Sequence, residues 1–131
     1  MNLDGGDLRL VSTGKGQTTC AYFFPGDHKI LYSSTHHIDP DCPPPRPREK
    51  RFIWPLHPYE IFAAKRDGLD LKQLTFTRSY NAEATVSRDG KIVFTSFREG
   101  DLDIYTMDQD GSNAKRLTHK LYQETYGKKS R

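Results

Sequence analysis

Short runs that mix apolar and polar residues recur along the chain, and turns rich in Asp and Gly separate them. Residues 29–34 (KILYSS) and 91–96 (KIVFTS) are rich in β-branched and aromatic residues, as half-buried strands require. Residues 59–65 and 102–108 have the same character. Asp-Gly between such runs favours a hairpin, because the turn needs a positive φ that Gly adopts readily. The pattern therefore predicts an all-β chain of short antiparallel strands.

The chain also repeats itself. Residues 4–12, 67–75 and 110–118 each open with Asp-Gly and end with an apolar residue followed by Ser or Thr. Between them, residues 23–34 match residues 85–96, and residues 59–68 match residues 102–111. Each unit is expected to form four strands over roughly 40 to 45 residues, which is the spacing of a β-propeller blade.

This repeat divides the 131 residues into one propeller segment. Residues 15–75 form one expected blade and residues 79–118 a second. Residues 1–14 are expected to carry the outer strand of a preceding blade, at Leu8–Ser12. Residues 119–131 begin a next blade or form a tail.

The second unit, residues 81–118, resembles the TolB-type propeller repeat, a WD40-like β-propeller repeat. That repeat carries Ser-Pro-Asp-Gly, an Ile-x-Phe-x-Ser run, Asp-Ile-Tyr-x-Met-Asp, Asp-Gly and Leu-Thr in this order. The matching residues are Ser87, Asp89, Gly90, Ile92, Val93, Phe94, Ser96, Asp103, Ile104, Tyr105, Met107, Asp108, Asp110, Gly111, Leu117 and Thr118. Arg88 departs from the pattern, since the family usually has proline there. The resemblance implies incomplete propeller architecture with about two complete blades.

Propellers close with four or more blades, so two blades leave three interpretations open. The chain is a fragment or truncated member of a longer propeller, two blades stand alone, or several copies complete a ring. In the last two cases the blade faces that normally stack on neighbours are exposed, which favours association.

Residues 36–58 interrupt the first blade and hold seven of the eight prolines. We expect this insertion to be a candidate partner-binding loop, since long loops are uncommon unless functional or disordered. Pro44 and Pro47 satisfy a PxxP pattern typical of polyproline II ligands. The alternative is a surface loop pinned by its prolines. The candidate contact residues are Pro44, Arg46, Pro47, Arg48 and Trp54.

Two small groups of residues suggest further chemistry. Cys20 and Cys42 are a candidate disulfide that ties the insertion to the first strand; the alternative is two free thiols. His36, His37, Asp39 and Asp41 are weak candidates for a metal site. Adjacent histidines of a strand point to opposite faces, so a polar loop entrance is the simpler interpretation.

Composition excludes several function classes. The net charge is +3, from 20 basic and 17 acidic residues, and this balance argues against a nucleic-acid partner. No run of 18 apolar residues exists, so no membrane insertion is expected. Residues 1–14 lack the basic and apolar regions of a signal peptide. The resemblance nevertheless implies a periplasmic or secreted location.

For function, we expect a non-catalytic protein–protein interaction or scaffold module with no cofactor and no catalytic residues. No GxSxG or HExxH motif is present. The alternatives are an accessory propeller segment of a larger enzyme, either a prolyl-oligopeptidase-type peptidase or a sugar lyase, and a propeller that binds a metal or small ligand. The protein partner is not identified, and self-association through blade faces is a further expectation.

The strand aromatics are expected to fill the blade core: Tyr22, Phe24, Tyr32, Phe62, Phe94 and Tyr105.

Overall fold

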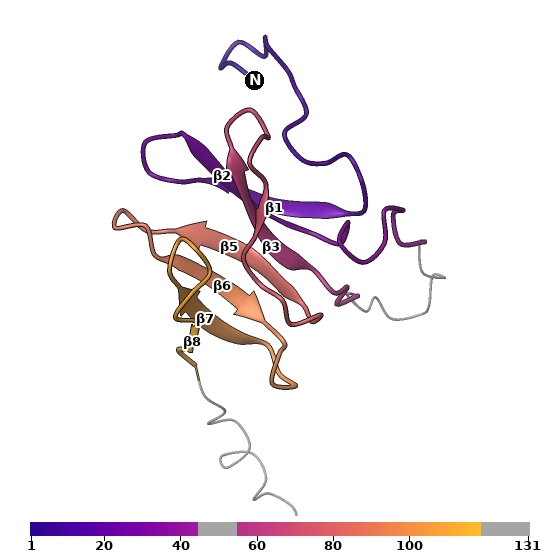
Figure 1. The fold of residues 1–131 in the computed structure, drawn as a ribbon, viewed down its shortest axis with the longest axis vertical. Helices are drawn as coiled ribbons and strands as arrows, with labels where there is room; N and C mark the ends of the chain where they lie inside the picture. The colour runs from indigo at the N-terminus through magenta and orange to yellow at the C-terminus, as the bar shows by residue number, and fades with distance from the viewer. Residues whose placement is uncertain (45–54, 119–131) are drawn as a thin grey trace, which may run out of the picture.

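The computed structural model describes residues 1–44 and 55–118, and these form two antiparallel sheets of four strands each, in sequential order (Figure 1). We call the first sheet blade 1 and the second blade 2. Blade 1 contains β1 (Thr18–Phe23), β2 (Lys29–Ser34), β3 (Glu60–Lys65) and β4 (Lys72–Gln73). Blade 2 contains β5 (Asn81–Val86), β6 (Ile92–Ser96), β7 (Asp103–Met107) and β8 (Lys115–Arg116). The all-β prediction is confirmed.

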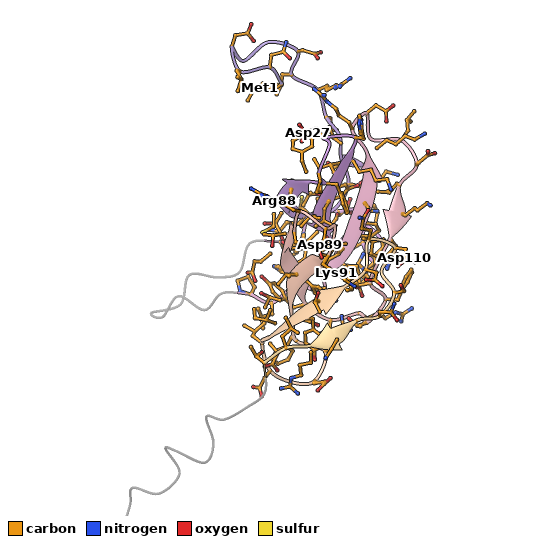
Figure 2. All side chains as sticks on the ribbon, turned by 90° about the vertical axis from the view of Figure 1, so that its left-hand side faces the viewer. Met1, Asp27, Arg88, Asp89, Lys91 and Asp110 are labelled. Carbon is orange, nitrogen blue, oxygen red and sulfur yellow. The ribbon has the colours of Figure 1, made fainter. Side chains whose placement is uncertain are left out.

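The turns between strands follow the repeat. In blade 2, the turn that joins β5 to β6 is closed by Ser87 N, which donates to the Lys91 carbonyl at 2.9 Å. The Ser87 hydroxyl also donates to Asp89 Oδ1 at 2.5 Å, so the turn forms although Arg88 replaces the usual proline. Figure 2 labels Arg88, Asp89 and Lys91 of this turn, and Asp89 and Lys91 line one shallow pocket together with Asp110.

The apolar core lies mainly between the two blades. Leu31, Ile61 and Ala63 of blade 1 form one buried cluster with the aromatic pair Phe94 and Tyr105 of blade 2, whose ring centroids are 5.8 Å apart. The cluster also contains Phe24, Leu74, Ala84, Val86, Ile92 and Met107. Neither thin sheet can bury its apolar face alone, so the blades stabilise each other by stacking.

Five of the six strand aromatics expected in the core are buried, namely Phe24, Tyr32, Phe62, Phe94 and Tyr105. The prediction is wrong for Tyr22, which is exposed. The register of β1 shifts between Thr19 and Tyr22, and the equivalent position in β5, Thr85, is exposed as well. The bulge and the strand alternation that follows it therefore turn this side chain away from the core.

The first strand of each blade, β1 and β5, contains this bulge at the same place. The register of β5 shifts between Ala82 and Thr85, as that of β1 does between Thr19 and Tyr22. In each bulge a residue other than glycine has a positive φ, 52° at Cys20 and 55° at Glu83.

Residues 8–12 are the place where the structure differs from the predicted strands. No strand forms there, although residues 72–73 and 115–116 do so at the equivalent positions of the repeat. A fourth strand needs a third strand beside it, and within residues 1–44 and 55–118 none lies next to this segment.

The described part of the chain contains no helix, and hence none of the length and apolarity that a membrane span requires.

Candidate protein-binding surfaces

An acidic residue and a threonine tie the third strand of each blade to the fourth. In blade 2 the Thr118 hydroxyl donates to Asp103 Oδ1 at 2.8 Å and accepts the Ile104 N–H at 3.0 Å. Arg116 forms an ion pair with the same carboxylate and with Glu99. These contacts give a physical reason for the Asp-Ile-Tyr and Leu-Thr parts of the repeat. In blade 1, Ile61 N donates to the Thr75 hydroxyl at 2.9 Å in the same way.

Glu60, which takes the place of Asp103 in blade 1, links the two blades. Its side chain is fully buried, and burial raises the pKa of its carboxyl group. Glu60 Oε1 accepts the Arg78 backbone N–H at 2.5 Å, and Oε2 accepts Asn81 Nδ2 at 3.0 Å. Asn81 is the first residue of β5 and also accepts the Ser96 hydroxyl at 2.8 Å. The carboxyl group therefore connects blade 1 to the strand that starts blade 2.

A cavity of about 590 Å³ lies beside this group, at the edge of the blades from which the insertion departs. Its lining residues are His37, Ile38, Glu60, Gln73, Phe76 and Arg78. Both ring nitrogens of His37 are buried without a protein partner among the described residues, and burial lowers the pKa of this imidazole. His36 instead lies 4.3 Å from the Phe62 ring centroid, and its Nδ1 is 2.8 Å from the Ser34 hydroxyl.

The weak metal candidates take part in separate local contacts. Asp39 Oδ1 accepts the Asp41 N–H at 2.9 Å, which closes a turn. The rings of His36 and His37 meet edge to face, with centroids 6.3 Å apart. Across residues 1–44 and 55–118, no three His, Cys, Asp or Glu side chains gather in a way that would hold a metal ion.

The two cysteines are free and exposed in this structure. The Cys42 thiol donates to the Gly16 carbonyl at 3.2 Å, so the start of the insertion lies against the chain that leads into β1. Burial raises the pKa of the Tyr59 hydroxyl, and the neighbouring Cys20 and Cys42 thiols raise it further. Both thiols thus lie near one side chain, and the disulfide between them stays a prediction.

Of the predicted partner-binding loop, Pro44 is described and exposed. Arg46, Pro47, Arg48 and Trp54 lie outside the described residues.

The open faces at the two ends of the stack are the most distinctive surfaces. On blade 2, the face turned away from blade 1 exposes Ile104 to 37% and Leu117 to 49%. Their equivalents in blade 1, Ile61 and Leu74, are buried in the core between the blades. We call this surface the C-side face. It also includes Leu102, Val93 and Thr106.

The opposite end of the stack shows this contrast at one position, since Tyr32 and Phe62 are as buried as their equivalents Phe94 and Tyr105. Phe23 pairs with Ile30 in blade 1 as Val86 pairs with Ile92 in blade 2, so the register makes these two residues equivalent. Phe23 is 48% exposed, whereas Val86 is buried against blade 1. Beside Phe23, the partly buried Ile30 packs on a small cluster of Tyr32, Phe62 and Ala64. We call this surface the N-side face. The sequence predicted that unstacked faces would be exposed, and aligning the repeats shows which side chains form them.

Glu60 and Asn81 are the residues that sequence reasoning missed. The alignment of Glu60 with Asp103 in the repeat was the available signal, because an acidic residue starts both third strands. The role of Asn81 had no such signal, since Thr18 takes its place in blade 1.

No protein-family model matches this chain, and no curated protein matches it either. Solved structures do resemble it. A protein assigned as TolB from Agrobacterium tumefaciens superposes on 79% of the chain with a TM-score of 0.59 and 20% sequence identity. TolB from Acinetobacter baumannii superposes on 77% of the chain with a TM-score of 0.54 and 24% identity. The chain spans 31% of the first protein and 21% of the second. The two stacked blades therefore have the fold of a TolB-like β-propeller segment.

Proposed function

We propose that this chain is a non-catalytic protein–protein interaction module, a scaffold of the TolB-like propeller type, which binds other proteins through the open faces of its two blades. The observation that carries the proposal is the contrast between equivalent side chains. Ile61 and Leu74 are buried where blade 1 meets blade 2, whereas Ile104 and Leu117 are exposed on the C-side face.

The contact between the blades indicates that each face binds a partner by burying its apolar side chains. Fully burying one large aliphatic or aromatic side chain contributes about 1.5 to 3 kcal/mol. The C-side face offers Ile104, Leu117 and Leu102 for burial, and the N-side face offers Phe23. These side chains are already about half buried. A partner that covers the C-side face therefore gains part of this increment from each of three side chains, and one that covers the N-side face gains it from one. Contiguous apolar surface of this kind is typical of protein interaction sites.

The resemblance to TolB-type repeats supports a periplasmic or secreted setting for this interaction, and that location is part of the proposal. The contact between the blades also suggests a second copy of this chain as one available partner. The N-side face is equivalent to the face of blade 2 that packs on blade 1, and the C-side face is equivalent to the face of blade 1 that it packs on. The N-side face of one copy can therefore pack on the C-side face of another.

Light scattering coupled to gel filtration tests the proposal over a range from low micromolar to several hundred micromolar chain. We expect the mass to rise with concentration as faces of different copies meet. The variants Ile104→Lys and Phe23→Lys place a charge on one face each and should reduce this rise. Leu69→Lys is the matched control, because Leu69 is an exposed leucine of the turn between β3 and β4 and belongs to neither face.

A chain that stays monomeric at every concentration, with all three variants identical to it, contradicts the proposal. A discrete multimer that Ile104→Lys dissociates supports it.

A further inference from the structure

In blade 2 a guanidinium group is held between two carboxylates beside the start of β7. Arg116 Nη1 donates to Glu99 Oε2 at 2.6 Å, and Nη2 donates to Asp103 Oδ2 at 2.5 Å. The Arg116 side chain is only 21% exposed, and that of Asp103 is 8% exposed. The fourth strand of blade 2 thus fills this position with its own cation.

The strand register shows which residues of blade 1 take the places of Arg116 and Asp103. Gln73 pairs with the third strand of blade 1 as Arg116 pairs with that of blade 2. Glu60 pairs with the last residue of β2 as Asp103 pairs with the last residue of β6. Blade 1 therefore keeps a carboxylate at this position but replaces the guanidinium with a neutral amide.

The loop after β2 places His37 where blade 2 has Glu99. His36 and Arg98 each have the backbone nitrogen and one side-chain nitrogen 2.8 to 3.3 Å from the hydroxyl of the serine that ends the preceding strand. Each also lies over the central aromatic ring of the third strand, 4.3 Å and 4.5 Å from the ring centroid. These two residues are thus equivalent, and so are the residues that follow them.

The three residues that replace the ion-pair cluster, His37, Glu60 and Gln73, line the cavity of about 590 Å³. Gln73 is shorter than an arginine, and its Nε2 donates to the Thr75 carbonyl at 2.8 Å. Neither ring nitrogen of His37 has a protein partner in the described part of the chain. The cavity thus adjoins the position that a guanidinium fills in blade 2.

Glu60 places a buried negative charge at the wall of this cavity without a paired cation. Its side chain is fully buried, and its hydrogen-bond donors are the neutral Arg78 N–H, the Asn81 amide and the Thr75 hydroxyl. Over residues 1–44 and 55–118 no Lys or Arg side chain forms an ion pair with it. Arg98 acts on it through Asn81, whose Oδ1 accepts Arg98 Nη2 at 3.2 Å. A buried carboxylate without a paired cation is costly, so a cation in the cavity gains from pairing with it.

The rest of the lining suits the remainder of an arginine side chain. Phe76 is 73% exposed and Ile38 is 50% exposed, so both offer apolar surface at the cavity. A planar guanidinium stacks well on an aromatic ring, and its aliphatic stem packs on apolar side chains. Arg78 also lines the cavity, but its side chain is exposed and solvent screens its charge.

We propose that this cavity binds an arginine side chain of a partner protein, in the position that Arg116 occupies in blade 2. The bound guanidinium pairs with the Glu60 carboxylate, donates to a ring nitrogen of His37 and stacks on Phe76. None of these residues belongs to the C-side face or the N-side face. The inference therefore goes beyond the proposed function and does not rest on it.

The probe is the peptide acetyl-Gly-Arg-Gly-amide, titrated into the full 131-residue chain labelled with ¹⁵N. We expect chemical-shift changes centred on His37, Ile38 and the Gln73 side-chain amide. The same peptide with citrulline in place of arginine has nearly the same shape but no charge, and it should bind at least tenfold more weakly. The peptide with lysine should also bind more weakly, because an ammonium lacks the planar fork.

Two variants of the chain fill or copy the cavity. Gln73→Arg supplies the guanidinium from β4, so it should abolish binding and raise the urea midpoint of unfolding. Lys72→Arg is the matched control, because Lys72 is the exposed neighbour on β4 and does not line this cavity, so binding should be unchanged. Arg116→Gln removes the guanidinium of blade 2 and should create a second site, near Glu99 and Asp103.

Phe76→Ala keeps the test decisive if Gln73→Arg disturbs the fold. Phe76 is exposed, and loss of its stacking should weaken binding of the arginine peptide about three- to fivefold. The proposal is overturned if the arginine peptide causes no shifts at the cavity, or if citrulline or lysine binds equally well. It is also overturned if a folded Gln73→Arg variant binds the peptide as the unchanged chain does.

Discussion

Replacing Gly111 with alanine should destabilise the chain by about 3 kcal/mol, for two separable reasons. Gly111 has φ of 88°, and a left-handed conformation costs an L-residue with a side chain about 1 to 2 kcal/mol. The added Cβ would also lie 2.5 Å from the Leu74 carbonyl oxygen and 3.1 Å from its Cα. Because both are backbone atoms, blade 1 and blade 2 must move apart locally, and such overpacking costs about 1 to 3 kcal/mol.

The repeat provides matched controls for this substitution. Gly5 has φ of 83° but no atom within 4 Å of its added Cβ, so Gly5→Ala should cost only the conformational part, about 1 to 2 kcal/mol. Gly68 has φ of 86° and its added Cβ would meet the Val11 carbonyl oxygen at 2.6 Å. Gly68→Ala should strain its own turn and displace residues 8–12, while the core between the blades stays closed.

Urea unfolding followed by far-ultraviolet circular dichroism measures the three losses of stability. We expect the order Gly111→Ala, then Gly68→Ala, then Gly5→Ala, with about 2 kcal/mol between the first and the last. Hydrogen exchange should show faster opening of residues 8–12 in Gly68→Ala. Equal losses for Gly5→Ala and Gly111→Ala would refute the reasoning, since the close approach of Leu74 would then contribute nothing.

Three further predictions follow from other parts of the structure. Phe94→Ala should lower the free energy of unfolding by about 3 to 5 kcal/mol in urea titrations, because the ring is almost fully buried between the blades. Burial lowers the pKa of His36 and of His37, so the unfolded chain binds more protons below about pH 6.5 and stability falls as pH falls through that window. Replacing both with glutamine should flatten this part of the stability profile. Under oxidising conditions the Cys20–Cys42 bond should form, making the chain two hydrogens lighter by mass spectrometry and stabilising it by about 3 kcal/mol; two freely alkylated thiols would contradict this.

The sequence predicted the strands because local turn chemistry and strand composition agree in each repeat. Asp110 and Gly111, for example, specify their turn by themselves, since a glycine takes the positive φ and the aspartate Oδ1 accepts the N–H of Ser112. The same turn at residues 2–7 forms even though residues 8–12 that follow it form no strand. Turn formation depends on neighbours in sequence, whereas strand formation depends on a partner in space.

The surfaces were harder to predict because they depend on which blade lies next to which. Ile61 and Ile104 occupy the same position of the repeat and have the same chemistry, yet one is buried and the other exposed. The bulges at Cys20 and Glu83 escaped prediction for a different reason, because neither residue type favours a positive φ. Their conformation is imposed by the pairing of β1 with β2 and of β5 with β6.

The insertion in blade 1 has a consequence for the order in which the chain folds. The link from β6 to β7 is residues 97–102, whereas the link from β2 to β3 is residues 35–59, about four times as long. Each doubling of a flexible loop adds roughly 0.6 kcal/mol to the entropic cost of closing it, so the central hairpin of blade 1 closes about 1.2 kcal/mol less readily. Blade 2 should therefore form first and serve as the surface on which blade 1 is completed. Shortening the insertion should accelerate refolding while leaving the unfolding rate nearly unchanged.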